Sequence, residues 1–162
     1  MKRCRYAGIE TYDINNGTGF GVTLFVQGCS HHCDGCHNPS TWDFDGGMVF
    51  TEDVKEKLFE VLDNENIRRL TISGGEPFDN LDLVIPIAKE FKDKYPSKQL
   101  WIYTGYTFED IEQILDTSGL LDICNVIVDG EYKKDKRDLS LGFRGSSNQR
   151  VIVIPHEDIG EM

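Results

Sequence analysis

The chain has 162 residues, a length typical of one domain, and its 17 Lys and Arg against 28 Asp and Glu give a formal net charge of −11. A surface with this excess of carboxylates would repel nucleic acids and anionic membranes, so we expect neither as a partner. No apolar stretch approaches the roughly 20 residues that cross a bilayer, and no apolar leader follows the basic residues 1–6, which predicts a cytoplasmic protein.

Five short apolar segments predict β-strands. They are rich in β-branched and aromatic residues, and most are apolar at nearly every position, which is typical of strands covered on both faces in a parallel sheet. The segments are 20–27, 70–72, 100–103, 123–128 and 151–154.

Three helices are expected between these strands. Thr51 can cap a first helix that carries apolar residues at helical spacing up to residue 62. A second should follow residues 79–80, and it tolerates Pro86 only in its first turn. A third should begin after Thr107 and end before Gly119.

Strands that alternate with helices of this length predict an α/β fold built from βα units. We expect a single domain over residues 1–162, a partial (β/α) barrel of about five mainly parallel strands with the helices outside. In such folds the chemistry belongs at the C-terminal ends of the strands.

The five cysteines are unevenly placed along the chain. Cys29, Cys33 and Cys36 have the spacing C-x3-C-x2-C directly after the first predicted strand, whereas Cys124 falls in a predicted strand as a buried residue and Cys4 near the terminus as a free thiol. Three thiolates on a short glycine-containing loop can hold a 4Fe-4S cluster and leave one iron open. Clusters that only transfer electrons normally have four protein ligands, so the open iron indicates another role.

Three other interpretations of this loop remain open at this point. Residues 33–37 also match C-x-x-C-H, the attachment signature of c-type haem, although such proteins are secreted and usually helical. A zinc site could take its fourth ligand from His31, His32 or His37, but no second pair of ligands follows in the sequence. The cysteines could also be small structural residues, which the polar, glycine-rich setting disfavours.

A glycine turn ends the second predicted strand. Gly74 and Gly75 would let the backbone approach a ligand closely, Glu76 offers an acceptor for a cationic group, and Pro77 stiffens the exit. Taken alone, this sequence is also typical of an ordinary turn. Its position is more informative, because the ends of neighbouring parallel strands lie at the same edge of a sheet, and we expect the turn to lie beside the cysteine loop.

The two motifs together resemble those of the radical S-adenosylmethionine enzymes, which carry C-x3-C-x2-C followed on the next strand by a Gly-Gly-Glu type motif. The resemblance is greatest to the activating proteins of anaerobic ribonucleoside-triphosphate reductase, and it runs from about residue 13 to residue 150. The further segments that carry it are 38–42, 101–106, 128–132 and 144–149.

The resemblance implies a cofactor arrangement. Each of the three cysteines of the loop would bind one iron of a 4Fe-4S cluster, and the amino and carboxylate groups of S-adenosylmethionine would chelate the fourth iron. Gly74 and Gly75 would pack along its methionyl part, with Glu76 near the amino group. An aromatic residue often contacts the adenine in this class, but Gly35 occupies that position here. The adenine contact is therefore expected from the backbone of Gly35 and Cys36 or from His37.

The resemblance also implies an activity. One electron, from a low-potential donor such as flavodoxin, would cleave S-adenosylmethionine, and the 5′-deoxyadenosyl radical would take hydrogen from a glycine of the reductase large subunit. The cofactors carry the difficult step, so no acid–base catalytic residue is expected. The alternatives are an activase of another glycyl-radical enzyme and a non-catalytic Fe-S or zinc-binding module.

One segment of the acidic chain is basic. Residues 131–150 contain six Lys and Arg against three Asp and Glu. Such a run is usually a solvated loop, and the alternative is a docking surface for the reductase or its electron donor.

Overall fold

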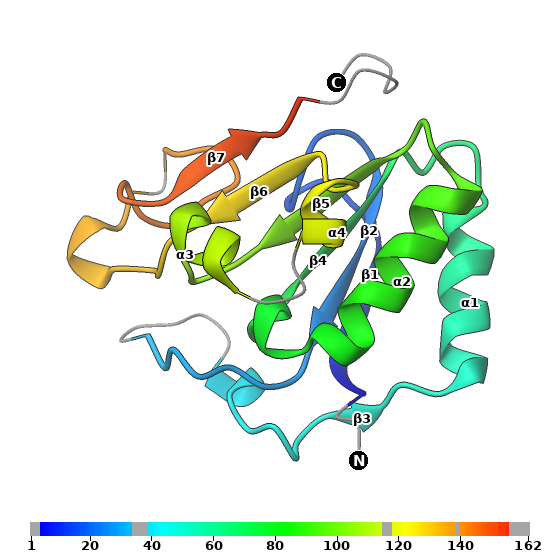
Figure 1. Cartoon of the computed structure of the whole chain (residues 1–162), viewed down its shortest axis with the longest axis horizontal. Coiled ribbons are helices and arrows are strands. Elements are labelled where there is room, and N and C mark those ends of the chain that lie inside the picture. Colours follow the sequence, from blue (N-terminus) through cyan, green and yellow to red (C-terminus); the bar gives the residue numbers. More distant parts are fainter. Residues whose placement is uncertain (1–3, 34–38, 115–117, 139, 156–162) are drawn as a thin grey trace.

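The computed structural model describes residues 4–33, 39–114, 118–138 and 140–155, and within them it shows one mixed α/β sheet with helices. Seven strands follow the order β3-β1-β2-β4-β5-β6-β7 across the sheet (Figure 1). Their bounds are β1 Arg5–Asp13, β2 Gly21–Val26, β3 Met48–Val49, β4 Arg69–Gly74, β5 Gln99–Tyr103, β6 Val126–Asp129 and β7 Arg150–Val153. The helices are α1 Glu52–Leu62, α2 Leu81–Lys94, α3 Phe108–Gln113 and α4 Ser118–Leu121, and the 3₁₀ turns are η1 Pro39–Thr41, η2 Pro77–Asp79 and η3 Lys134–Lys136.

The centre of the sheet is parallel and its margins are antiparallel. Strands β2, β4, β5 and β6 pair in parallel, whereas β1, β3 and β7 run antiparallel to their neighbours. The α/β class is confirmed, but the described residues form seven strands rather than about five, because β1 and β3 were not predicted. The order begins with β3 and ends with β7, so this part of the chain does not close into a barrel.

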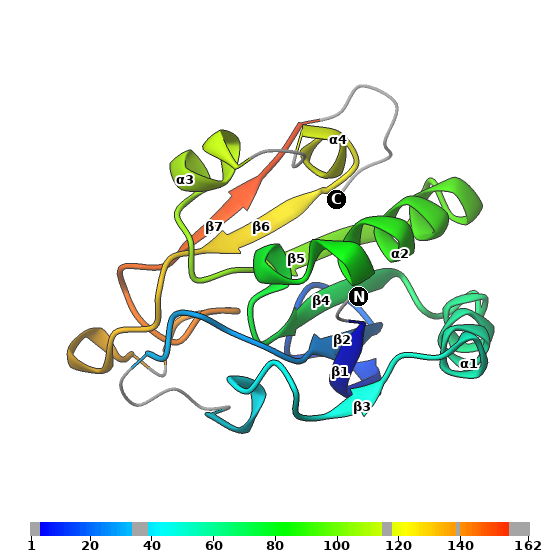
Figure 2. The same cartoon turned by 60° about the horizontal axis from the view of Figure 1, so that its bottom comes forward.

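The helices lie along one side of the sheet (Figure 2). Each parallel connection moves one strand further in the same direction, and right-handed crossovers then place every intervening helix on the same face. Apolar residues from that face and from the helices form the main core. They include Val22, Leu24, Ile72, Leu100 and Ile102 of the sheet, Leu58 and Leu62 of α1, and Val84, Ile87 and Phe91 of α2.

The helix ends follow the capping pattern with two corrections. Thr51 caps α1, as predicted, since its side-chain oxygen accepts the N–H three residues later at 3.3 Å, and Thr107, where the third helix was expected to begin, caps α3 in the same way at 3.2 Å. The expectation that Pro86 lies in the first turn is wrong, because it is the sixth residue of α2. Pro86 and Asp82 are both exposed, so water can satisfy the Asp82 carbonyl that the proline leaves without a donor. Gly119 lies inside α4 rather than after a single helix. No described helix is long and apolar enough to span a bilayer.

Strand β6 begins at Val126, three residues later than predicted. The N–H groups of Ile123 and Cys124 both donate to the Leu120 carbonyl, at 3.2 and 3.0 Å, so this stretch closes a turn before the strand. Cys124 is fully buried, as predicted, although it precedes the strand. Cys4 is a half-buried free thiol, also as predicted.

The face of the sheet opposite the helices, here called the inner face, contains a buried ion pair. Arg69 is fully buried and its Nη2 donates to the Asp13 carbonyl at 2.6 Å, with the Asp13 carboxylate at 3.6 Å. Its Nη1 donates to Thr71 Oγ1 at 2.8 Å. Trp101 is the register partner of Thr71 and therefore lies on the inner face, and because side chains alternate along a strand, Tyr103 two residues later lies there too.

Candidate functional site

The cysteine loop leaves the C-terminal end of β2 and is fixed by backbone hydrogen bonds. The Gly28 N–H donates to the Thr41 carbonyl at 2.7 Å, and the Cys29 N–H donates to the Trp42 carbonyl at 3.2 Å. Gly28 has a φ of +116°, and a Cβ there would lie 2.2 Å from the Phe44 ring, so glycine is required at this position. The first cysteine is therefore held rigidly against residues 41–42.

The glycine turn lies beside this loop, as the sequence predicted. Val26 and Gly74 are partners in the parallel pairing of β2 and β4. The Gly75 N–H donates to the Val26 carbonyl at 2.9 Å and the Glu76 N–H to the Gly28 carbonyl at 2.7 Å. A Cβ on Gly75 would come within 2.4 Å of the Gly28 oxygen, so no other residue allows this approach without a backbone shift.

The two motifs line one cavity of about 180 Å³, here called the cysteine cavity. Its lining includes Cys29 and Cys33, both half-buried, together with all three residues of the Gly-Gly-Glu turn. The other lining residues are His31, Ser73, Tyr103, Thr104, Gly105, Gly130, Tyr132 and Gln149. Gly35, Cys36 and His37 lie outside the described residues, and the described part of the chain contains no group of three metal-ligating side chains.

The residues of the cysteine cavity fit an iron–sulfur cluster with a ligand beside it. Two thiols line the cavity together with the glycines of the turn, and the backbone N–H groups of His31 and His32 lie near the Cys29 sulfur and favour its thiolate form. Such N–H donors stabilise a thiolate ligand. Burial raises the pKa of Cys29 to about 11, so the metal-free thiol is protonated at neutral pH and metal binding must release its proton.

The Glu76 carboxylate is only 1% exposed and accepts four hydrogen bonds. Oε1 accepts from His31 Nε2 and from the Gly105 N–H, both at 2.7 Å. Oε2 accepts from Thr104 Oγ1 at 2.7 Å and from the Phe78 N–H at 3.0 Å. Glu76 therefore joins the ends of β2, β4 and β5, a role the sequence did not indicate. Its contact with an amino group remains a prediction.

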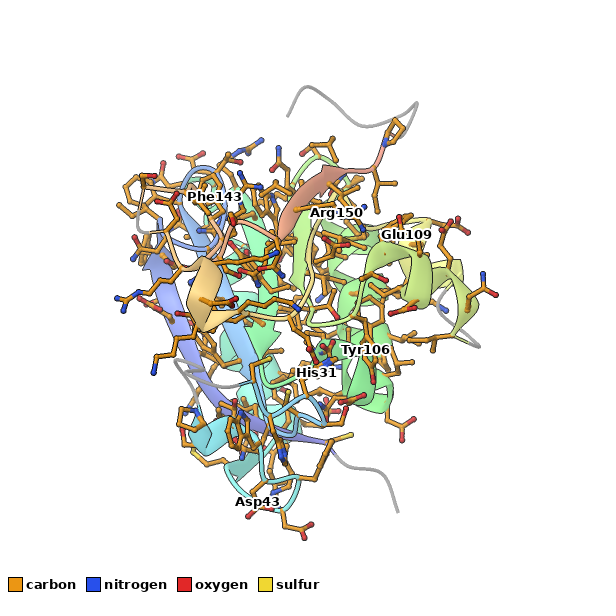
Figure 3. All side chains as sticks on the ribbon, turned by 90° about the vertical axis from the view of Figure 1, so that its left-hand side faces the viewer. His31, Asp43, Tyr106, Glu109, Phe143 and Arg150 are labelled. Carbon is orange, nitrogen blue, oxygen red and sulfur yellow. The ribbon has the colours of Figure 1, made fainter. Side chains whose placement is uncertain are left out.

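His31 bridges two carboxylates at the rim of the cysteine cavity. Its Nε2 donates to Glu76, and its Nδ1 donates to Glu131 Oε2 at 2.9 Å. Burial alone would lower the pKa of His31, but hydrogen bonding and charge from Glu76 and Glu131 raise it to about 9, so the ring is an imidazolium at neutral pH. It packs edge-on against Tyr106 with ring centroids 4.5 Å apart, and Figure 3 shows the two side by side.

These contacts weaken the zinc interpretation. Both ring nitrogens of His31 are occupied by carboxylates, and His32 stacks on Trp42 with ring centroids 4.5 Å apart. Neither described histidine is therefore placed as a fourth ligand beside the cysteines. His37, the third candidate, lies outside the described residues.

Two further cavities adjoin the cysteine cavity. One of about 690 Å³ shares His31, Gly105 and Gly130 with it and is lined mainly by charged residues. The other, of about 370 Å³, shares Tyr103, Tyr132 and Gln149 with it and is here called the inner-face cavity. Lys133 and Arg150 of the basic segment line the cavity of about 690 Å³, and Arg150 pairs with Glu109 and Asp129. Four cations of this segment are exposed and form no ion pair within the part of the chain described. They are Lys133, Lys134, Lys136 and Arg137.

Comparison with known proteins agrees with this geometry. Residues 15–152 match the model of the 4Fe-4S single cluster domain family. The curated relatives include three anaerobic ribonucleoside-triphosphate reductase-activating proteins. The protein of Pasteurella multocida (strain Pm70) is 40% identical over a region that covers 86% of this chain and 90% of the relative. The protein of phage T4 is 39% identical over a region that covers 90% of this chain and 92% of the relative. The protein of Escherichia coli (strain K12) is 37% identical over a region that covers 86% of this chain and 92% of the relative.

The fold and the site thus define a 4Fe-4S single cluster domain protein. The identity and coverage of the curated relatives define the family more narrowly than the family model does. The chain belongs to the family of anaerobic ribonucleoside-triphosphate reductase-activating proteins.

Proposed function

We propose that this protein activates anaerobic ribonucleoside-triphosphate reductase in the cytoplasm, as a radical S-adenosylmethionine enzyme formed by a single domain over residues 1–162. When bound, a 4Fe-4S cluster and S-adenosylmethionine supply the chemistry: one electron converts the sulfonium into methionine and a 5′-deoxyadenosyl radical, which takes hydrogen from a reductase glycine. The observation that carries the proposal is the cysteine cavity, where two cysteines and the Gly-Gly-Glu turn meet.

Residues of this chain have distinct tasks in the proposal. Cys29, Cys33 and Cys36 hold three irons, while Gly74 and Gly75 leave room for the methionyl part along bare backbone. Backbone at Gly35 and Cys36, or the ring of His37, contacts the adenine. The Glu76 carboxylate stands near the methionyl amino group and holds the cavity rim through its four hydrogen bonds. A partial-barrel arrangement around the cavity and a low-potential donor such as flavodoxin complete the proposal.

Anaerobic reconstitution with iron and sulfide, followed by an assay for 5′-deoxyadenosine with and without dithionite, tests this function. We expect a brown protein that releases 5′-deoxyadenosine only when reduced, and Cys29→Ser, Cys33→Ser and Cys36→Ser variants that release none. Cys4→Ser, which removes a thiol outside the cavity, is the matched control and should behave as wild type.

The other outcomes favour the alternatives. A colourless protein that binds zinc would contradict the proposal, and a cluster without reductive cleavage would indicate an electron-transfer module. Cleavage without a glycyl radical on the reductase, monitored by electron paramagnetic resonance of the mixed proteins, would indicate an activase of another glycyl-radical enzyme.

A further inference from the structure

The hydroxyl group of Tyr103 is buried and has no hydrogen-bond partner among the residues that the structure describes. Tyr103 is the last residue of β5, and its side chain lies on the inner face at the C-terminal end of the parallel strands. A buried hydroxyl left without a partner is destabilising, because it has given up its hydrogen bonds to water without replacement. A residue that bears this cost at the edge of a site is a candidate for contact with a bound ligand.

Neighbouring groups do not satisfy this hydroxyl. The Asp13 carboxylate is engaged by the Asn15 N–H, Asn16 Nδ2 and Thr23 Oγ1, and it faces Arg69 at 3.6 Å. Burial raises the pKa of Tyr103 well above its ordinary value, so the phenol is neutral and can donate its proton to an acceptor. An acceptor oxygen placed beside it would therefore complete its hydrogen bonding.

Tyr103 borders both the cysteine cavity and the inner-face cavity. The cysteine cavity alone, at about 180 Å³, is smaller than the roughly 300–1,000 Å³ of ordinary ligand sites. A ligand of nucleoside size must therefore extend beyond it, and Tyr103, Tyr132 and Gln149 form its boundary with the inner-face cavity. The unpartnered hydroxyl thus stands on one of the two sides where a ligand of the cysteine cavity can continue, the other side being the cavity of about 690 Å³.

We propose that the Tyr103 hydroxyl donates a hydrogen bond to an acceptor oxygen of S-adenosylmethionine, either its carboxylate or a ribose hydroxyl. The inference rests on the proposed function, since it takes S-adenosylmethionine as the occupant of the cysteine cavity. It adds a binding residue from β5 to those of the cysteine loop and the glycine turn.

The test compares wild type with Tyr103→Phe, which removes only the oxygen, in the cluster-reconstituted protein. Two quantities are measured: the Kd for S-adenosylmethionine by calorimetry, and the melting temperature without and with this ligand. We expect Tyr103→Phe to bind about tenfold more weakly, which corresponds to one hydrogen bond, and to melt at least as high as wild type without the ligand.

Tyr95→Phe is the matched control. Its hydroxyl donates to Asp63 Oδ1 at 3.1 Å at the end of α2, away from both cavities. It should melt slightly below wild type and bind S-adenosylmethionine equally well. The two variants therefore separate a ligand contact from an ordinary structural hydrogen bond.

Unchanged affinity in Tyr103→Phe, or a lower melting temperature of its ligand-free form like that of the control, would overturn the inference and leave the proposed function intact. A wild-type protein that assembles the cluster but does not bind S-adenosylmethionine would overturn both proposals.

Discussion

Replacement of Glu76 by glutamine tests how the rim of the cysteine cavity is held together. The buried carboxylate accepts hydrogen bonds from His31, Phe78, Thr104 and Gly105, which belong to three segments far apart in the sequence. Glu76→Gln keeps the shape of the side chain and replaces one acceptor oxygen with an NH₂ group. It therefore perturbs the hydrogen bonds and the charge without creating a cavity.

The cost depends on which donor the NH₂ group faces. If the NH₂ group takes the place of Oε1, it faces the Gly105 N–H, and if it takes the place of Oε2, it faces the Phe78 N–H. In both cases two donors meet, and a backbone N–H cannot turn away. The Thr104 hydroxyl can rotate to accept, so the second orientation is the less costly. It still loses one bond to a charged acceptor, about 1.5–3 kcal/mol, and leaves a buried N–H unsatisfied, about 1–3 kcal/mol. We expect Glu76→Gln to lower the free energy of unfolding by about 4 kcal/mol.

Urea unfolding of the cluster-free protein at pH 7, followed by far-UV circular dichroism, measures this difference. A loss of this size is a large part of the roughly 5–15 kcal/mol typical of a domain. Glu112→Gln, an exposed carboxylate on α3, is the control and should change stability by less than about 0.5 kcal/mol. A loss below about 1 kcal/mol in Glu76→Gln would refute the reasoning that these four bonds fasten the rim.

Three further predictions concern the surroundings of the site and use the same urea assay. Burial alone would raise the pKa of Asp13, but its hydrogen bonds and then Arg69 lower this pKa below 3.8, so the ionised carboxylate stabilises the fold above about pH 4. Asp13→Asn should therefore lower the free energy of unfolding by about 2 kcal/mol at pH 7. The free energies of unfolding of variant and wild type should converge as the pH falls through the folded pKa of Asp13. Convergence at high pH instead would contradict this. Gly75→Ala places a Cβ 2.4 Å from a backbone oxygen and should cost about 1–3 kcal/mol, whereas Gly142→Ala, in open space, should be neutral; equal effects would contradict the close approach. Arg150→Ala leaves the buried Asp129 carboxylate without its guanidinium and should cost about 2 kcal/mol, while an unchanged midpoint would show that the pair contributes nothing.

Local patterns predicted the elements whose residues carry regular signals. Helix α1 combined a capping threonine with apolar residues at helical spacing, and its bounds followed from both. Strand β1 was missed because residues 5–13 mix glycine and charged residues with isolated apolar ones, and most of them are only half-buried. Strand β3 has two exposed residues and no pattern to detect.

The juxtaposition of the two motifs was predictable, but the contacts around them were not. Parallel strand ends share an edge, which was enough to expect the cysteine loop beside the glycine turn. The partners of Glu76 and the orientation of Tyr103 depend on how β4 and β5 align, and strand register has no local signature in the sequence. The same holds for Arg69, whose burial depends on Asp13 from β1, a strand that was not predicted.

The distance between the thiols and the glycine turn is determined by backbone contacts. The Gly28 carbonyl accepts hydrogen bonds from the Glu76 N–H and from Asn80 Nδ2, so two donors of the segment after β4 bind the start of the cysteine loop. Gly75 lacks the Cβ that would lie 2.4 Å from the Gly28 oxygen, so the spacing of the two loops does not depend on flexible side chains, whereas a Cβ on Gly28 would meet the Phe44 ring. A larger residue at Gly75 should therefore displace the cysteine loop, so that a substitution in the glycine turn alters cluster assembly without contacting a cysteine.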